Sequence, residues 1–268
     1  MGEEHSVNNP IAPSSLHVEV HKPQNGSDEL QLPPILLIHG YASSGDQNWN
    51  RSGWTSALTN AGRLVITVDL PGHGLSKSPE GDDEYRPSTI CATFREIVRG
   101  ILQQHALVQE PAPLVDVIGY SLGSRLAWQF AATYPEVVRR LVLGAPSRHD
   151  PFADFDHEAA ELYLANGRSP TNSTTAEFLR MGQGGAGHTI SELLRMIRQF
   201  QSEPFRPSEA VPQAPALLVA GDRDPLAETM PELAALAPSH EILWLPSRNH
   251  TNTVSSRNFK NAAINFLS

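Results

Sequence analysis

Several features that mark whole classes of protein are scarce or missing in this sequence. Its 268 residues include a single cysteine, Cys91, so an internal disulfide is excluded. No run of about 18 apolar residues is present, which argues against a membrane-spanning helix. The first residues, MGEEHSVNNP, lack the apolar core of a signal peptide. From these absences we expect a cytoplasmic protein with no membrane span.

Basic side chains are also scarce. Lys plus Arg number 20 against 29 Asp plus Glu, which gives a net charge of −9. Binding to nucleic acid or to an anionic membrane relies on clustered basic side chains, and no basic run is present. No histidine spacing such as H-x-x-x-H suggests a metal. We therefore expect a small-molecule substrate, with no nucleic acid, metal or cofactor; the oligomeric state is left open.

What the sequence does contain is an alternation of short apolar runs and helical patterns. The strands are expected at residues 15–20, 35–38, 64–68, 114–118, 140–143, 216–220 and 241–245. The helices that separate them are expected at residues 54–61, 88–105, 122–134, 231–236 and 256–267. Such an alternation predicts an α/β fold with a mostly parallel sheet covered by helices on both faces.

Residues 145–212 interrupt this alternation. They contain no clear strand and three short helical patterns, at roughly 157–164, 175–181 and 190–201. Each helix is too short to build a core of its own. We therefore expect a small helical cap inserted within a single domain that spans residues 1–268.

The segment Gly119-Tyr120-Ser121-Leu122-Gly123 joins a predicted strand to a predicted helix. It matches the G-x-S-x-G nucleophile elbow, in which a serine sits on a sharp, strained turn. The glycines have a steric reason, because a strained turn leaves no room for a Cβ two residues before or after the serine. The alternative is an ordinary strand-to-helix turn, since two glycines and a serine also occur by chance.

Other polar residues stand where predicted strands end. His39, Asp69, Ser121, Asp224 and His250 each follow an apolar run. In a parallel sheet, ligand sites form at the carboxyl ends of the strands. A serine nucleophile needs a base within reach and an orienting group behind the base. The order serine, acid, histidine is the one found with nucleophile elbows.

On these motifs the chain resembles the α/β-hydrolase superfamily, in the branch of small soluble serine hydrolases with a helical cap. The resemblance covers roughly residues 33–268. It rests on His39-Gly40, the loop from Asp69 to Gly74, the elbow, the segment Gly221-Asp222-Arg223-Asp224 and His250. It implies that Ser121 is the nucleophile and His250 the base, with an oxyanion hole formed by the backbone N–H groups of Tyr41 and Leu122.

Two aspartates compete for the third catalytic position. The family pattern G-x-x-D implies that Asp224 orients His250, whereas Asp222 is expected to hold the loop by capping backbone N–H groups. Asp69 precedes the elbow in sequence and is better interpreted as a loop residue.

The remaining histidines are expected to have other roles. His39 lies beside the oxyanion loop and is expected to make a structural hydrogen bond, and His73 is expected to serve packing and turn geometry. His149, His157 and His188 lie in the insertion and are candidates for substrate contact, the alternative being that they face solvent.

Apolar residues of the insertion are the candidates for the substrate pocket, namely Phe152, Phe155, Tyr163, Phe178, Met181 and Ile197. The alternative is that they only pack the cap against the sheet. Two arginines of the insertion, Arg148 and Arg180, are candidates to bind a substrate carboxylate.

The implied activity is that of a serine hydrolase that cleaves a carboxylic ester, thioester or lactone through an acyl-enzyme. A C–C bond hydrolase and a cofactor-free haloperoxidase-like enzyme are alternatives on the same fold, and a non-catalytic ligand-binding relative is a third. Haloalkane dehalogenases and epoxide hydrolases of the superfamily carry aspartate at the elbow, so Ser121 argues against them.

Overall fold

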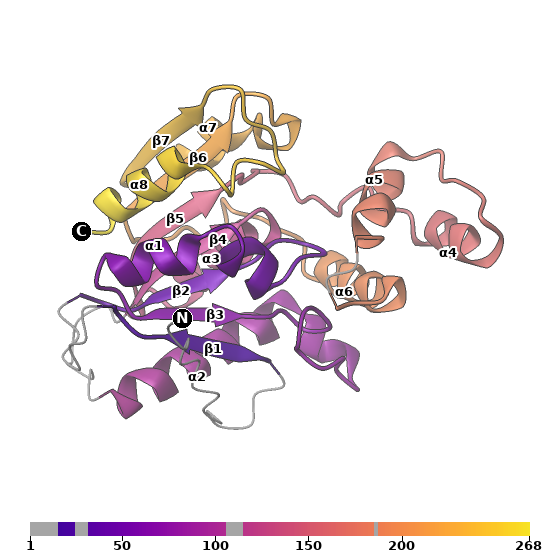
Figure 1. Cartoon of the computed structure of the whole chain (residues 1–268). Helices are drawn as coiled ribbons and strands as arrows, with labels where there is room; N and C mark the ends of the chain where they lie inside the picture. Colours follow the sequence, from indigo (N-terminus) through magenta and orange to yellow (C-terminus); the bar gives the residue numbers. More distant parts are fainter. Residues whose placement is uncertain (1–15, 25–31, 106–114, 185–186) are drawn as a thin grey trace.

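The computed structural model describes residues 16–24, 32–105, 115–184 and 187–268 (Figure 1). Ser15, Leu114 and the polar N-terminal segment of the sequence lie outside these residues. The expected strands are present as β1 (Val18–His21), β2 (Ile35–Ile38), β3 (Val65–Val68), β4 (Val115–Tyr120), β5 (Val138–Gly144), β6 (Ala216–Gly221) and β7 (His240–Leu245). Their order in the sheet is β1-β3-β2-β4-β5-β6-β7, and every pair except β1 with β3 is parallel. The predicted mostly parallel sheet is confirmed.

Helices cover both faces of this sheet. The five helices expected outside the insertion are α1 (Trp54–Asn60), α2 (Pro87–Gln104), α3 (Leu122–Thr133), α7 (Met230–Ala234) and α8 (Arg257–Phe266). Helices α1 and α8 contribute buried residues to the core on one face, and α2, α3 and α7 to the core on the other. Three short helical turns were not expected from the sequence: Asp46–Asn50, Asp82–Tyr85 and Pro225–Ala227.

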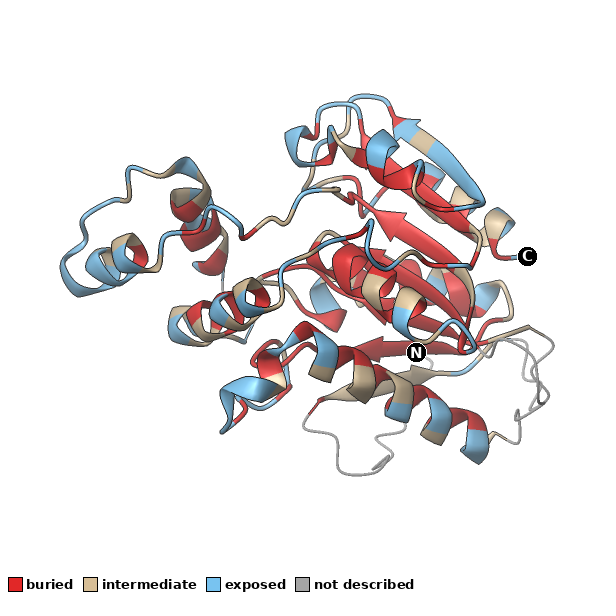
Figure 2. Cartoon of the chain, turned by 180° about the vertical axis from the view of Figure 1, so that it is seen from behind, coloured by how far each residue is buried: buried red, intermediate tan, exposed pale blue. Residues whose placement is uncertain are grey.

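Strand β2 shows why the central runs are continuously apolar. All four of its residues are fully buried. Ile35 and Leu37 belong to the core beneath α1 and α8, whereas Leu36 and Ile38 belong to the opposite core. A strand covered on both faces needs an apolar side chain at every position. Figure 2 shows this burial along the central strands, and also that the edge strand β7 is largely exposed.

Three helices lie between β5 and β6, in the segment where the insertion was expected. They are α4 (His157–Asn166), α5 (Ser173–Gly182) and α6 (Ile190–Ser202). Each begins at a residue whose side chain accepts a hydrogen bond from the first turn: Asp156, Asn172 and Thr189 respectively. Figure 1 shows the three helices together beyond the carboxyl ends of the strands.

The two ends of this helical segment meet at one carboxylate. Asp150 accepts hydrogen bonds from the backbone N–H groups of Phe152 (3.0 Å) and Phe205 (2.8 Å). Its third partner is the Arg125 guanidinium of α3, at 2.9 Å. Because Arg125 follows Ser121 by one helical turn, the base of the segment is tied directly to the elbow helix.

A buried charge network closes the opposite end of the sheet. Asp116, the second residue of β4, has a fully buried side chain that accepts hydrogen bonds from Arg63 and, at 2.9 and 2.7 Å, from Arg139. A register shift between β4 and β5 at this point leaves Arg139 without a partner in the ladder, and its side chain reaches Asp116. Arg63 also donates to the carbonyl oxygens of Pro33 and Leu267.

None of the helices that the structure describes is both long and apolar enough to cross a membrane.

Candidate active site

Ser121 sits on a strained turn between β4 and α3. Its φ of 53° and ψ of −115° are a combination that non-glycine residues rarely adopt. A Cβ on Gly119 would lie 2.2 Å from the carbonyl oxygen of Gly123, and one on Gly123 would lie 2.0 Å from that of Ile38. Both glycines are therefore required by close backbone contacts, as the elbow pattern predicted.

Hydrogen bonds from the neighbouring strand hold this turn in place. The Ser121 N–H donates to the Gly144 carbonyl at 2.8 Å. The Ser124 hydroxyl lies 2.7 Å from the same carbonyl and 2.9 Å from that of Gly119. Sequence reasoning missed Ser124, although its place one turn into the helix is a signal that a hydroxyl can reach back to the preceding strand.

The structure brings Ser121, His250 and Asp224 together. Nε2 of His250 lies 2.8 Å from the Ser121 Oγ, and Nδ1 lies 2.8 Å from Oδ2 of Asp224. The Asp224 side chain is fully buried, and its other oxygen accepts a hydrogen bond from the Leu226 N–H at 3.1 Å. A carboxylate that accepts from Nδ1–H leaves Nε2 free to accept the serine proton.

Close packing between two loops places the acid beside the histidine. A Cβ on Gly221 would lie 2.1 Å from the Arg248 carbonyl oxygen, so only glycine lets the loops after β6 and β7 approach. The Arg223 N–H donates to that same carbonyl at 2.9 Å. The Tyr120 hydroxyl, missed by sequence reasoning, donates to the His250 carbonyl at 2.5 Å.

Asp222, the alternative acid, lies away from this cluster. Its side chain is exposed, and no other residue in the described part of the chain makes a hydrogen bond with it. The expectation that it caps backbone N–H groups is therefore wrong. The physical reason is that the loop is held by backbone bonds instead, such as that of Asp222 N–H to the Leu245 carbonyl at 3.0 Å.

The loop after β2 presents one backbone N–H group beside the serine. The Gly40 N–H donates to Asn48 Oδ1 at 2.8 Å, and the Ala42 N–H donates to Nε2 of His73 at 3.3 Å. The Tyr41 N–H between them donates to no residue that the structure describes. A Cβ on Gly40 would lie 3.3 Å from the Ser121 Cβ, so this loop packs against the elbow.

Leu122 supplies a second unpaired N–H group. It is the first residue of α3, and neither a side chain nor a carbonyl in the described residues accepts from its N–H group. The first N–H groups of a helix carry partial positive charge and suit an anion. The N–H groups of Tyr41 and Leu122 are therefore available to a bound oxygen, and their role as an oxyanion hole stays a prediction.

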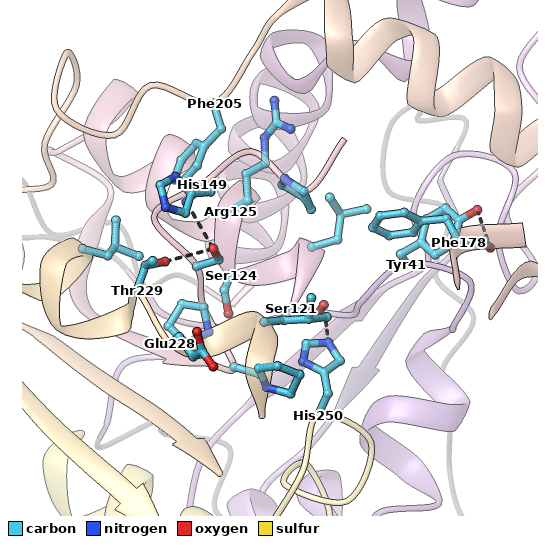
Figure 3. A pocket seen from close by; sticks show the side chains of 18 of the residues that line it. Tyr41, Ser121, Ser124, Arg125, His149, Phe178, Phe205, Glu228, Thr229 and His250 are labelled. Carbon is cyan, nitrogen blue, oxygen red and sulfur yellow. Dashed lines mark hydrogen bonds between the residues drawn. The ribbon is translucent and has the colours of Figure 1, made fainter. Parts of the chain in front are cut away.

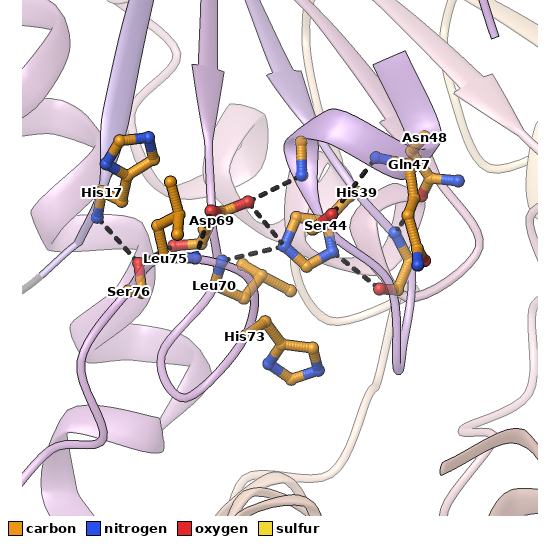
Figure 4. A network of polar contacts seen from close by, with 12 residues as sticks. His17, His39, Ser44, Gln47, Asn48, Asp69, Leu70, His73, Leu75 and Ser76 are labelled. Atoms are coloured by element: carbon orange, nitrogen blue, oxygen red, sulfur yellow. Dashed lines mark hydrogen bonds and ion pairs between the residues drawn. The ribbon is translucent and has the colours of Figure 1, made fainter. Parts of the chain in front are cut away.

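A polar network beneath this loop holds its shape (Figure 4). Asp69 accepts hydrogen bonds from the N–H groups of Gly45 (2.7 Å) and Leu75 (2.8 Å). Nε2 of His39 accepts from the Leu70 N–H at 2.9 Å. Burial lowers the pKa of His39 to about 4 and that of His73 to about 3, so both rings are neutral at pH 7. The structural roles expected for Asp69, His39 and His73 agree with these contacts.

A cavity of about 380 Å³ opens beside Ser121 (Figure 3). Tyr41, Leu122, Phe178 and Met181 form an apolar part of its wall. Residues that sequence reasoning did not single out form much of the rest: Ser124, Arg125, Ala145, Pro146, Ser147, Pro151, Phe205, Pro225, Leu226, Glu228, Thr229 and Leu233. Several of these residues follow Asp224. Their position after the end of a strand is the feature of the sequence that could have marked them as pocket residues.

Of the six predicted pocket residues, two line this cavity, Phe178 and Met181. The prediction has to be corrected for the other four. Phe152, Phe155 and Ile197 are buried in the core, and Tyr163 packs against that core while its hydroxyl accepts from Gln183. Phe152 stacks between other aromatic rings, which shows the physical reason: these side chains join the helical segment to the sheet.

Of the histidines and arginines proposed to contact substrate, one lines the cavity and the others lie outside its wall. His149 lines the cavity, whereas His157 and His188 do not and instead contact Gln201 and the Gly182 carbonyl. Arg148 pairs with Glu232 and Arg180 with Glu177, all at the surface and outside the cavity wall.

No group of three or more His, Cys, Asp or Glu side chains is placed to hold a metal ion within the described ranges.

This geometry agrees with a match to a family model. The model described as "alpha/beta hydrolase fold" matches residues 33–166, which is half of the chain and includes the Tyr41 loop and the elbow. The chain belongs to the α/β-hydrolase fold family. The fold class predicted from the sequence, with a mostly parallel sheet flanked by helices, is thereby confirmed.

Individual relatives within the α/β-hydrolase fold differ in how much they share. A pimeloyl-[acyl-carrier protein] methyl ester esterase of Xylella fastidiosa is 28% identical over 263 residues, covering 87% of this chain and 93% of that protein. The AB hydrolase superfamily protein YfhM of Bacillus subtilis is 33% identical over 139 residues, covering 50% of this chain. The chain spans under half of that relative, 41% of its length.

Solved structures extend the likeness to nearly the whole chain. The enol-lactonase from Burkholderia xenovorans superposes with a TM-score of 0.67 over 94% of this chain and 96% of that one. Its sequence identity of 18% makes this a likeness of fold alone.

Proposed function

We propose that this α/β-hydrolase is a serine hydrolase that cleaves a carboxylic ester, thioester or lactone by way of an acyl-enzyme. The observation that carries the proposal is the pair of 2.8 Å contacts that link Ser121 to His250 and His250 to Asp224. The esterase name of the Xylella relative, which this chain matches over most of its length, supports the ester class.

In the first half of the proposed reaction, the Ser121 Oγ attacks the substrate carbonyl carbon. Nε2 of His250 accepts the serine proton, and Asp224 stabilises the imidazolium through Nδ1–H. The tetrahedral intermediate then collapses, the bond to the leaving oxygen or sulfur breaks, and His250 returns the proton to that atom. The acyl group remains on Ser121 as an ester.

In the second half, a water molecule replaces the leaving group. His250 accepts a proton from this water, and the resulting hydroxide attacks the acyl carbon. Collapse of the second intermediate releases the acid and returns the proton to Ser121. No group beyond these side chains and water is required.

The negative oxygen of each intermediate needs hydrogen-bond donors. The N–H groups of Tyr41 and Leu122 are unpaired in the described residues; the first lies on the loop after β2 and the second at the start of α3. Loss of one such donor typically costs about 3 kcal/mol of transition-state stabilisation. Asn48 and His73 act indirectly here, because they hold the N–H groups on either side of Tyr41.

We further propose that residues 145–212 act as a cap on a single domain. Phe178 and Met181 come from α5 and line the cavity opposite residues of the main fold. A volume of about 380 Å³ lies near the lower end of the range for small-molecule sites, about 300–1,000 Å³. It suits a substrate of modest size.

The test uses a fluorophosphonate probe and the p-nitrophenyl ester of a short acid. The wild-type protein is expected to be labelled by the probe and to hydrolyse the ester. Ser121→Ala is expected to abolish labelling and to reduce kcat by about 10⁶-fold. Ser255→Ala, which removes an exposed hydroxyl outside the cavity, is the matched control.

Wild-type protein that is neither labelled nor active would contradict the proposal. So would hydrolysis that survives in Ser121→Ala, because the nucleophile would then lie elsewhere.

A further inference from the structure

The charges that face the cavity are few. Among its lining residues two carry a formal charge at neutral pH, Arg125 and Glu228; His149, His250 and Tyr41 are the other titratable groups. Whether the cavity attracts a cationic or an anionic substrate depends on which of these two charges is already compensated.

The charge of Arg125 is compensated within the protein. Its guanidinium lies 2.9 Å from the Asp150 carboxylate and donates to the carbonyl oxygens of Glu203 (2.6 Å) and Phe200 (3.4 Å). Its side chain is 4% exposed, and in Figure 3 the guanidinium points away from Ser121. The Nε–H group is buried and has no hydrogen-bond partner among the described residues. Arg125 is thus half of a neutral pair.

The charge of Glu228 is not compensated. Its side chain is exposed at the cavity wall and forms no ion pair or hydrogen bond with any residue that the structure describes. Arg148, whose backbone N–H contacts the neighbouring Thr229, is held by Glu232 at 2.8 Å, and Arg223 of the same loop contacts the Ser247 hydroxyl. The cavity therefore carries one unbalanced negative charge, in a protein whose net charge is −9.

The Glu228 carboxylate lies at one end of the cavity, and the two ends differ in polarity. Figure 3 shows Glu228 and Thr229 on one side of Ser121, and Tyr41 and Phe178 on the other. Around Thr229 the wall is polar, since its hydroxyl lies 3.2 Å from that of Ser147. Around Phe178 the wall is aromatic, with the rings of Tyr41 and Phe178 5.0 Å apart.

The two ends of the cavity suit different parts of an ester. Asp224, which holds His250, lies on the loop that continues to Glu228. We infer that the leaving group, which His250 protonates, occupies the polar end beside Glu228. The acyl group is then assigned to the apolar end, beside Tyr41 and Phe178.

We propose that Glu228 is a specificity-determining residue and that the preferred substrates are esters of an apolar acid with an alcohol that carries an ammonium group. This inference rests on the serine hydrolase function proposed above and names its substrate class. Anionic leaving groups are disfavoured at the same place by repulsion from the carboxylate.

The experiment compares three butyryl esters that differ in the charge of the alcohol. They are the ester of choline, the ester of 3,3-dimethylbutanol, which has the same shape without charge, and the ester of 4-hydroxybutanoate. For wild-type protein, kcat/KM is expected to be about threefold to fivefold higher for the choline ester than for its neutral counterpart, the size typical of a solvent-exposed charge pair. The anionic ester is expected to be the poorest of the three.

Glu228→Gln keeps the side-chain size and removes the charge, so the ratio of choline ester to neutral ester is expected to fall to about 1. Glu241→Gln is the matched control: it changes the net charge equally, at an exposed position on β7 away from the cavity, and should keep the wild-type ratio.

The outcomes separate this inference from the function on which it rests. Hydrolysis of the neutral ester by Ser121 with no preference for choline, or with an unchanged ratio in Glu228→Gln, would overturn the role of Glu228 and leave the serine hydrolase standing. A preference for the anionic ester would overturn it too and would point to Arg125. Failure to hydrolyse any of the three would overturn the role of Glu228, and the serine hydrolase function would fall with it if the fluorophosphonate probe also failed to label Ser121.

Discussion

Strand β4 begins and ends in two opposite kinds of polar environment. At its amino end, the Asp116 carboxylate is fully buried and shared by the guanidinium groups of Arg63 and Arg139. At its carboxyl end, the Ser121 hydroxyl is partly exposed, and the neighbouring Leu122 N–H has no partner in the described residues. The polar groups at the amino end of β4 are thus paired with one another, whereas those at its carboxyl end are left available.

The difference lies in how completely the polar groups are satisfied. Burial lowers the pKa of Arg63, but the Asp116 carboxylate and two backbone carbonyls satisfy its guanidinium. The carboxyl end instead keeps donors unpaired and a serine at positive φ, both of which reduce stability. Polar groups paired with each other hold the fold, whereas groups left unpaired are available to a substrate.

The largest expected effect tests the carboxyl end. Replacing Asp224 by Asn keeps the shape but removes the charge that fixes the His250 tautomer, so kcat is expected to fall by about 10⁴-fold. The variant should unfold at nearly the same urea concentration as the wild type. Ester hydrolysis and urea titration on the same sample measure both quantities.

Asp222→Asn is the control for this change, because Asp222 is exposed and lies outside the cluster. If Asp222→Asn were inactive and Asp224→Asn active, the assignment of the acid would be reversed.

The next effect tests the amino end. Asp116→Ala leaves the buried Arg63 without its carboxylate, and the free energy of unfolding is expected to fall by about 3–5 kcal/mol. Activity per folded molecule should stay at the wild-type level, since the site is at the other end of β4. Chemical denaturation and active-site titration with the fluorophosphonate probe measure the two quantities.

Asp82→Ala breaks a surface ion pair with Arg195 and should cost less than about 1 kcal/mol. Equal losses for Asp116→Ala and Asp82→Ala would show that the network at the amino end has no special role.

The smallest expected effect is the loss of folding stability at low pH that arises from His73. The folded pKa of His73 is about 3, below the value near 6.5 of an unfolded chain, so the unfolded chain binds more protons in between. Its contribution to stability is complete above about pH 6.5 and is lost as the pH falls toward 3. The contribution to the slope is about 1.4 kcal/mol per pH unit.

Urea unfolding between about pH 6.5 and 4.5 measures this slope for the wild type and for His73→Asn, in which it should be shallower. His240→Asn, at an exposed position, should keep the wild-type slope. A wild-type slope in His73→Asn would mean that the acid sensitivity arises elsewhere in the molecule.

Local patterns predicted much of this molecule, because the elbow and the alternation of strands and helices along the chain can be recognised in short stretches of sequence. The apolar run of β2 and the spacing in α3 indicated their structures. The ends of strands marked Ser121, Asp224 and His250 as candidates, and the family resemblance implied their roles.

What local patterns missed depends on contacts between distant residues. The role of Asp116 was missed because the residue stands within an apolar run. Its partner Arg63 lies 53 positions away in the sequence, so no local pattern joins the two. The aromatic side chains of the insertion were assigned to the pocket, but Phe152 and Phe155 fill the core. Only the packed arrangement distinguishes a side chain that faces the cavity from one that faces the sheet.

The meeting of both ends of the helical segment at Asp150 has an evolutionary consequence. Since the N–H groups of Phe152 and Phe205 bind the same carboxylate, the intervening residues leave the main fold and return to it at one place. A segment whose ends already touch adds little strain to its host, whatever its length. We therefore propose that this helical segment can be exchanged as one piece, which would change the proposed substrate range while the sheet and Ser121 stay unchanged.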